Sequence, residues 1–202
     1  DQVAAFFANL PACVVGIEAC ASSHHWARKL ESFGHRVRLM APQFVKPYVK
    51  SNKNDAVDAE AICEAVSRPS MRFVPIKNIE QQAVLALHRA RQAFVKARTA
   101  QANQIRGLLG EYGLVVPQGI AHVNQRVPAL IEDAGNELPG SFRRLIYRLL
   151  DHLRELQRQV EEIEQQIRAW HRDNEASRRL EQVPGIGVLT ATALAATVGD
   201  AK

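Results

Sequence analysis

Two aspartates lie at a spacing that could do chemistry. Asp55 and Asp58 are three residues apart in NKNDAVDAEAIC (52–63), a stretch predicted to form a helix. Residues i and i+3 share one side of a helix, so both carboxylates can reach one point. Like charges there repel by about 0.2–0.5 kcal/mol unless a cation lies between them, and Mg²⁺ prefers carboxylate oxygens. The alternative is that both residues only complement the helix dipole.

Glu18 adds a third carboxylate at the end of a predicted strand, ACVVGIEA (12–19). An unpaired carboxylate is costly to bury there, and sites in open α/β sheets form beyond the carboxyl ends of strands. A strand-end glutamate plus a helix with two aspartates is an arrangement suited to metal-dependent phosphoryl transfer. We therefore predict that Glu18, Asp55 and Asp58 bind Mg²⁺ or Mn²⁺.

Basic residues precede these aspartates and recur along a later helix. In the preceding segment they are interleaved with Phe44 and Tyr48, and such mixtures hold phosphates and stack bases. On the helix, no acid occurs between Glu80 and Glu111, which favours contact with a nucleic acid backbone. Ordinary solvated surfaces are the alternative. The predicted nucleic-acid-binding residues are Lys46, Lys50, Lys53, Arg89, Arg91, Lys96, Arg98, Arg106, Gly185 and Gly187.

The two glycines belong to VPGIG (183–187), which lies between two helical patterns. The segment resembles a helix-hairpin-helix, in which glycines let backbone N–H groups approach a phosphate. A plain helix–turn–helix packing unit is the alternative.

The elements that would position these residues change in character near residue 78. Before it, apolar runs alternate with amphipathic patterns, which predicts a β-α-β unit with a parallel strand pair. Pro42 and Pro47 predict a loop before the aspartate helix. The predicted elements are helix 1–10, strand 12–19, helix 22–34, strand 35–40, helix 54–67, edge strand 71–76, and helices 79–112, 122–133 and 142–170.

The last long helix carries an unbroken heptad pattern. Its apolar residues recur in alternating steps of four and three, which is typical of the a/d seam of a coiled coil. They are Phe142, Ile146, Leu149, Leu153, Leu156, Val160, Ile163, Ile167 and Trp170.

Composition limits the class of protein. The chain has 202 residues, 47% of them apolar, which is enough for one large or two small domains. A net charge of +5 favours an anionic partner. Three cysteines without a C-x-x-C pair indicate a reduced, cytoplasmic protein rather than a disulfide framework or zinc site. No apolar run approaches the roughly 18 residues of a membrane span.

Three stretches, in this order and spacing, resemble the DEDD-type transposases of bacterial insertion sequences, relatives of the Piv invertases. They are GIEACASSHHWARKL (16–30), VRLMAPQFVKPYVKSNKNDAVDAEAI (37–62) and LEQVPGIGVLTATALAATVGD (180–200). The resemblance covers essentially the whole chain. It implies a RuvC-like, ribonuclease-H-type nuclease domain in which Glu18, Asp55 and Asp58 match the E, D and D of a catalytic tetrad.

The resemblance also implies DNA as substrate, a guide (bridge) RNA, and homo-oligomerisation through the coiled coil at 142–170. No residue of this sequence matches the first acid of the tetrad or the family's downstream nucleophilic serine. We therefore expect an internal fragment with an incomplete active site. The predicted class is α/β plus all-α: a partial RuvC-like domain at 1–77, a helical and coiled-coil region at 78–175, and the start of a C-terminal transposase domain at 176–202.

The predicted function is therefore DNA cleavage and strand exchange by a transposase in the bacterial cytoplasm. One alternative is a RuvC-like structure-specific nuclease or resolvase, which would need neither the heptad seam nor the hairpin domain. The other is a non-catalytic, nucleic-acid-binding coiled-coil protein in which the acids are structural.

Overall fold

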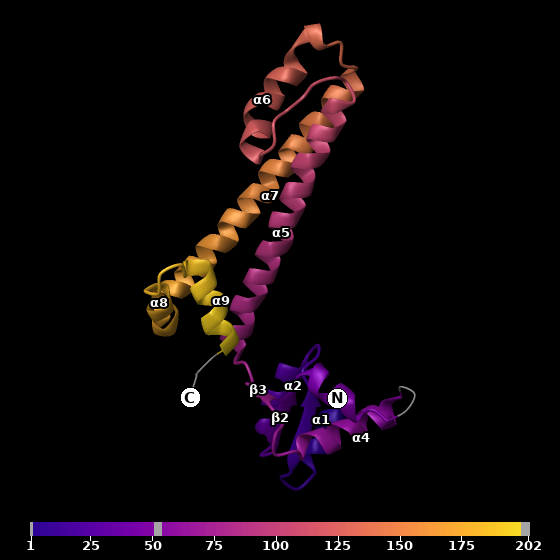
Figure 1. The fold of residues 1–202 in the computed structure, drawn as a ribbon, viewed down its shortest axis with the longest axis vertical. Coiled ribbons are helices and arrows are strands. Elements are labelled where there is room, and N and C mark those ends of the chain that lie inside the picture. Colours follow the sequence, from indigo (N-terminus) through magenta and orange to yellow (C-terminus); the bar gives the residue numbers. More distant parts are fainter. Residues whose placement is uncertain (1, 51–53, 199–202) are drawn as a thin grey trace. The chain divides into compact units, whose positions relative to one another are not determined.

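The computed structural model of the protein describes residues 2–50 and 54–198 (Figure 1). The chain divides into two compact units, one formed mainly by the residues up to Gln82 and one by Ala83–Ala196. Residues 176–196, which the sequence predicts to begin a third domain, lie in the second unit. Lys53 lies outside the described residues. Within those residues, no helix has both the length and the apolar character needed to cross a membrane.

A three-stranded sheet organises the described part of the first unit, in the order β1-β2-β3. β1 (Val14–Glu18) runs parallel to β2 (Arg36–Met40), and β3 (Phe73–Val74) pairs antiparallel with β2 at the edge. The register places Glu18 beside Met40. The predicted parallel pair and the edge position of the third strand are confirmed.

Three helices accompany this sheet: α1 (Gln2–Ala8), α2 (Ser23–Glu31) and α4 (Asp55–Val66). Successive strand residues point to opposite faces. Leu39 accordingly packs with Leu30 of α2, whereas Met40 belongs to a separate apolar cluster with Ala61 of α4. The sheet is therefore covered by α2 on one face and by α4 on the other.

The segment between β2 and α4 is more regular than the sequence predicts. Instead of a loop, it forms α3 (Pro42–Val45) and the 3₁₀ helix η1 (Lys46–Tyr48). Pro42 and Pro47 each lie at the start of one of these helices, where the missing N–H costs nothing and the fixed φ suits the turn. Val45, only 3% exposed, anchors the segment in the apolar cluster of Met40.

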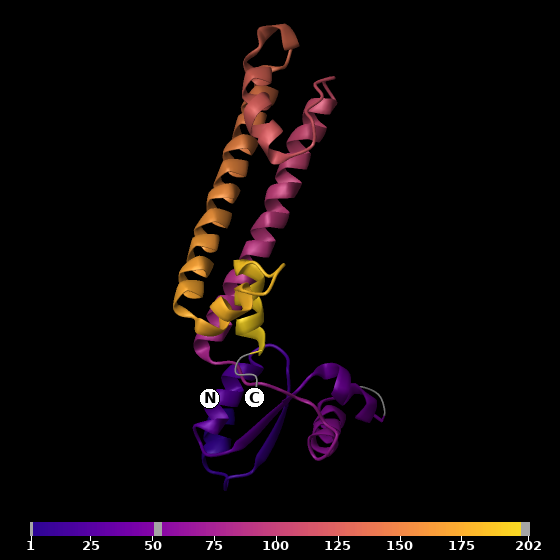
Figure 2. The same cartoon turned by 60° about the vertical axis from the view of Figure 1, so that its left-hand side comes forward.

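The second unit is built around three helices, α5 (Ile79–Gly110), α6 (Ile120–Glu132) and α7 (Gly140–Asp173). α5 and α7 run antiparallel beside each other, with α6 packed at one end (Figure 2). Their shared core includes Ile105 and Leu109 of α5, Val127 of α6, and Ile146 and Leu153 of α7, each at most 1% exposed.

The heptad seam of α7 packs largely against α5 within the same chain. Ile146, Leu153 and Ile167 are fully buried in a single chain. Polar contacts tie the same pair of helices together: Arg91 Nη2 lies 2.7 Å from Glu164 Oε1. A heptad pattern shows that a helix face needs a partner, but it cannot distinguish another segment of the chain from another copy.

The C-terminal part of this unit forms α8 (Glu175–Glu181), a turn, and α9 (Val188–Val198). His88 of α5 contacts Thr192 of α9, with 3.0 Å between Nε2 and Oγ1. The Thr192 hydroxyl also lies within hydrogen-bond distance of the Val188 carbonyl, at 2.9 Å. Burial and then the charge of Arg91 lower the pKa of His88, which favours the neutral ring. A partly buried hydrogen bond thus joins α9 to α5.

Candidate active site

Glu18 and Asp58, which are 40 positions apart in the sequence, line the same pocket. The pocket has a volume of about 440 Å³, and its other lining residues are Pro42, Val45, Lys46 and Val49. Glu18 is the last residue of β1, and Asp58 lies in the first turn of α4. The end of a strand, the start of a helix and the α3–η1 segment therefore converge on two half-buried carboxylates.

The start of α4 is capped by Asn54 rather than by an aspartate. The Asn54 Oδ1 atom accepts a hydrogen bond from the Val57 amide at 2.9 Å. Asp55 and Asp58 are left without a capping role, although both lie where the helix dipole favours negative charge. The dipole explains why acids are tolerated in this turn, but not why Asp58 shares a pocket with Glu18.

Asp55 does not join this pair. Its side chain is exposed one turn earlier on α4, and it does not line the pocket. Within residues 2–50 and 54–198, no three His, Cys, Asp or Glu side chains lie close enough to hold a metal ion together. Mg²⁺ commonly takes one or two protein carboxylates and completes its shell with water and substrate phosphates. The oxygen donors of Glu18 and Asp58 fit that requirement.

Gly16 determines how close α4 comes to β1. A Cβ atom at this position would lie 3.0 Å from Ile62 Cγ2, 3.1 Å from Val66 Cβ and 3.2 Å from Met40 Cε. The absence of a side chain lets α4, which carries Asp58, lie against the strand that ends at Glu18. Sequence reasoning missed this residue, although a glycine inside a strand often marks close backbone approach.

The two described lysines of the α3–η1 segment differ in their partners. Lys50 Nζ lies 3.3 Å from Glu64 Oε2 and 3.7 Å from Glu60 Oε1. Lys46 is exposed and lines the pocket, and its side chain makes no hydrogen bond or ion pair within the described residues. Of the two, Lys46 is the one whose charge is free to meet a ligand.

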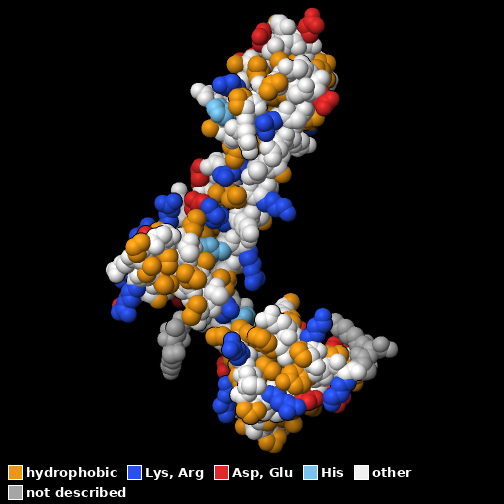
Figure 3. All heavy atoms as spheres, viewed as in Figure 1, with side chains coloured by type: hydrophobic (Ala, Val, Ile, Leu, Met, Phe, Trp, Pro, Cys, Tyr) orange, Lys and Arg blue, Asp and Glu red, His pale blue; other side chains and the backbone are white. Residues whose placement is uncertain are grey.

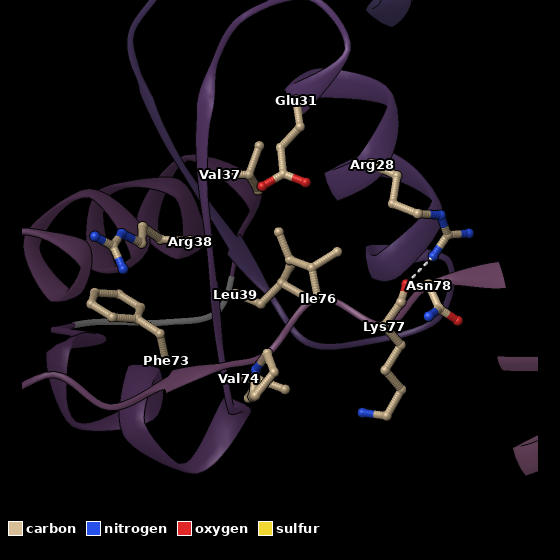
Figure 4. A pocket seen from close by; sticks show the side chains of 11 residues that line it. Arg28, Glu31, Val37, Arg38, Leu39, Phe73, Val74, Ile76, Lys77 and Asn78 are labelled. Atoms are coloured by element: carbon tan, nitrogen blue, oxygen red, sulfur yellow. Dashed lines mark hydrogen bonds between the residues drawn. The ribbon is translucent and has the colours of Figure 1, made fainter. Parts of the chain in front are cut away.

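A second pocket, of about 560 Å³, lies between α2, β2 and the chain that follows β3 (Figure 4). Its floor is apolar, Arg28 donates to the Lys77 carbonyl at one side, and Arg38 lies over the Phe73 ring, 4.8 Å from its centroid. Glu31 is the single acid among its lining residues. This pocket therefore contains none of the predicted metal ligands.

The basic stripe predicted on α5 separates into structural and free side chains. Arg91 pairs with Glu164, Arg98 Nη1 donates to Gln157 Oε1 at 2.5 Å, and Arg106 Nε donates to the Val116 carbonyl at 3.0 Å. These three arginines are half-buried and hold the second unit together.

Arg89 and Lys96, a heptad apart on α5, are exposed and have no hydrogen bond or ion pair in the described chain. On the face shown in Figure 3, Lys and Arg side chains project along the helices of the second unit. Arg89 and Lys96 are therefore the α5 cations best able to meet a polyanion.

The turn between α8 and α9 presents both predicted glycines at the surface. Gly185 has φ of +89°, a conformation that other residues rarely adopt. Gly187 is exposed, and no atom beyond its immediate neighbours lies within 4 Å of the place where a Cβ would be. The backbone here is open to close approach by a ligand.

Comparison with known proteins gives consistent matches over the whole chain. The family model DEDD_Tnp_IS110, described as "Transposase", matches residues 2–114. The chain is 50% identical over 202 residues to a "Probable family 20 transposase" of Pseudomonas aeruginosa, covering 100% of this chain and 60% of the relative. It is 47% identical over 201 residues to the "Transposase for insertion sequence element IS1328" of Yersinia enterocolitica, covering 100% of this chain and 59% of the relative.

A further relative is the "Transposase for insertion sequence element IS1111A" of Coxiella burnetii, which is 43% identical over 188 residues. That match covers 93% of this chain and 51% of the relative. The chain thus spans between 51% and 60% of the length of these three curated relatives.

Proposed function

This chain belongs to the DEDD transposase family of insertion sequences, and on that premise we propose that it takes part in the DNA cleavage and strand exchange of transposition. The observation that carries the proposal is the pocket shared by Glu18 and Asp58. These residues come from different elements, and the fold brings together two acids that the resemblance assigns to catalysis.

In this proposal Glu18 and Asp58 hold a divalent cation, Mg²⁺ or Mn²⁺. When bound, such an ion polarises a phosphodiester and lowers the pKa of the attacking water. Asp55, one turn earlier on α4, would approach the same cation from the solvent-exposed side of the pocket. Neither aspartate is needed as a helix cap, because Asn54 already supplies the hydrogen bond to the first turn.

We further propose that the first unit is part of a RuvC-like domain. The parallel β1-α2-β2 unit with its strand-end glutamate supports this assignment. A guide RNA, a homo-oligomer and a bacterial cytoplasmic location remain predictions of the resemblance. Because α5 occupies the seam of α7 within one chain, contacts between copies would use another surface.

Metal binding should be visible as stabilisation. Mg²⁺ or Mn²⁺ should raise the Tm of the full-length protein, because a ligand that binds only the folded state stabilises it, by about 2.7 kcal/mol at a hundred times Kd. A Glu18→Gln variant should lose most of this shift. Glu31→Gln, which changes an acid of the second pocket, should keep it.

The same cations should be required for cleavage of DNA that carries the ends of the element. Cleavage that persists in excess chelator would contradict the metal site. Neither stabilisation nor cleavage with any divalent cation would favour the non-catalytic alternative.

Nucleic acid binding should depend on Arg89 and Lys96 more than on the other cations of α5. Replacing both with alanine should weaken DNA or RNA binding and reduce the slope of log affinity against log salt by up to about two, since each phosphate contact contributes about one. Fluorescence anisotropy at several salt concentrations measures both quantities.

The matched control is Arg91→Ala with Arg98→Ala. It removes the same charge but breaks contacts with Glu164 and Gln157, so it should mainly lower the Tm of the helical unit. Equal losses of salt dependence in both double variants would show that the free and the structural cations do not differ as proposed.

A further inference from the structure

Lys46 lines the same pocket as the two carboxylates. Among the described residues, it is the one basic residue that lines the pocket of Glu18 and Asp58. It is exposed and makes no hydrogen bond or ion pair through its side chain. Lys50, at the other end of the same segment, is held by Glu60 and Glu64 instead.

The backbone of Lys46 is fixed although its side chain is free. Its N–H donates to the Pro42 carbonyl, and its own carbonyl accepts from the Val49 amide at 3.2 Å. The preceding residue, Val45, is 3% exposed in the apolar cluster under the segment. The anchored turn keeps the Cα of Lys46 at the pocket, while its flexible side chain stays free to reach a ligand there.

Resting on the proposed function, we propose that Lys46 is a further catalytic residue, whose ammonium contacts the phosphate that is cleaved at the Glu18–Asp58 site. Two carboxylates alone repel a phosphodiester. A cation lining the same pocket offsets that repulsion and stabilises the charge that develops on the phosphate oxygens. Val45 and Val49 line the same pocket, so part of its wall is apolar.

The charge of Lys46 should also affect metal binding, in the direction opposite to its effect on cleavage. Without DNA, the ammonium of Lys46 repels any divalent cation held by Glu18 and Asp58. Removing the charge should therefore tighten metal binding to the free protein while it slows cleavage. A residue that only supported the fold would weaken both.

The test compares Lys46→Met with Lys29→Met in the full-length protein; Lys29 is an exposed lysine of α2 that does not line the pocket. For Lys46→Met we expect the affinity for Mn²⁺ without DNA, measured by calorimetry, to rise about three- to tenfold. At saturating Mn²⁺, its rate of DNA cleavage should fall about a hundredfold, as for other preorganised donors at a developing charge. Lys29→Met should change neither quantity by more than about twofold. Lys46→Arg, which keeps the charge, should keep the original Mn²⁺ affinity and part of the cleavage rate.

Cleavage by Lys46→Met at the original rate, or weaker binding of Mn²⁺, would overturn the role of Lys46. Glu18→Gln separates that failure from a failure of the proposed function itself. Loss of Mn²⁺ binding and cleavage in Glu18→Gln, together with an unaffected Lys46→Met, would leave the metal site standing without the lysine. Intact binding and cleavage in Glu18→Gln would remove both.

Discussion

Replacing Asp58 with asparagine should reduce metal-dependent DNA cleavage by the full-length protein about 10²- to 10³-fold while the fold persists. Asp58 is half-buried and shares its pocket with Glu18, so the substitution removes one of two oxygen ligands and half of the negative charge there. Asn54 keeps the helix cap, and only a favourable dipole interaction of about 0.3–1 kcal/mol is lost. Cleavage under single-turnover conditions, with Tm measured beside it, tests this.

Two neighbours on α4 serve as controls for Asp58→Asn. Glu60→Gln removes an exposed acid of the same helix that pairs with Lys50, and it should leave cleavage unchanged. Asp55→Asn tests the resemblance, which implies a loss as large as that of Asp58→Asn, whereas the position of Asp55 outside the pocket supports a smaller one. Cleavage by Asp58→Asn within a few fold of the original rate would remove Asp58 from the site.

The contrast between Asp55 and Asp58 shows what sequence spacing predicts and what it does not. Spacing places both carboxylates on one side of a helix, and α4 has that geometry. It does not predict how the helix turns toward the sheet, because that depends on residues far away in the chain. The strand-end position of Glu18 was predictable, since the apolar run before it is a local pattern.

The loop predicted before α4 was wrong for a local reason. Pro42 and Pro47 block the middle of a helix but favour its first turn, so the same residues fit either a loop or the observed α3 and η1. The stripe of cations on α5 was visible in the sequence. The partners of Arg91 and Arg98, at Glu164 and Gln157, lie 73 and 59 residues further along the chain. Contacts at such separation decide which cation is structural and which is free.

A substitution that touches no charged group should also damage the site. Gly16→Val should lower the free energy of unfolding of the first unit by roughly 1–3 kcal/mol or more, because it overpacks the contact between β1 and α4. The closest atoms to the new Cβ would be Ile62 Cγ2 at 3.0 Å and Val66 Cβ at 3.1 Å. A Cβ atom cannot rotate away from its own backbone, so the Ile62 side chain or α4 itself must shift by a few tenths of an ångström. Chemical denaturation and Mn²⁺ titration would detect both consequences.

The matched control is Gly107→Ala on α5, where no atom outside the surrounding helix backbone lies within 4 Å of the new Cβ. It should raise stability by about 0.5–1 kcal/mol, as expected for alanine in place of glycine inside a helix. Gly16→Ala should instead lower stability. That contrast would show that the surroundings of the glycine, and not the change from glycine to alanine, determine the sign of the change in stability.

If Gly16→Ala displaces α4, its cost in stability should depend on Ile62, the α4 residue nearest to the added methyl group. Ile62→Ala removes the nearest atom, so in the double variant the cost of Gly16→Ala should shrink by about 0.5–3 kcal/mol. Mn²⁺ affinity should fall in Gly16→Ala and partly recover in the double variant, because Val66 still opposes the new methyl group. Full additivity of the two changes, with Mn²⁺ affinity unchanged throughout, would mean that the approach of α4 to β1 does not set the distance between Asp58 and Glu18. Such a result would leave the shared pocket as a coincidence of packing, whereas coupling in both measurements would tie the metal site to a strand residue that carries no functional group.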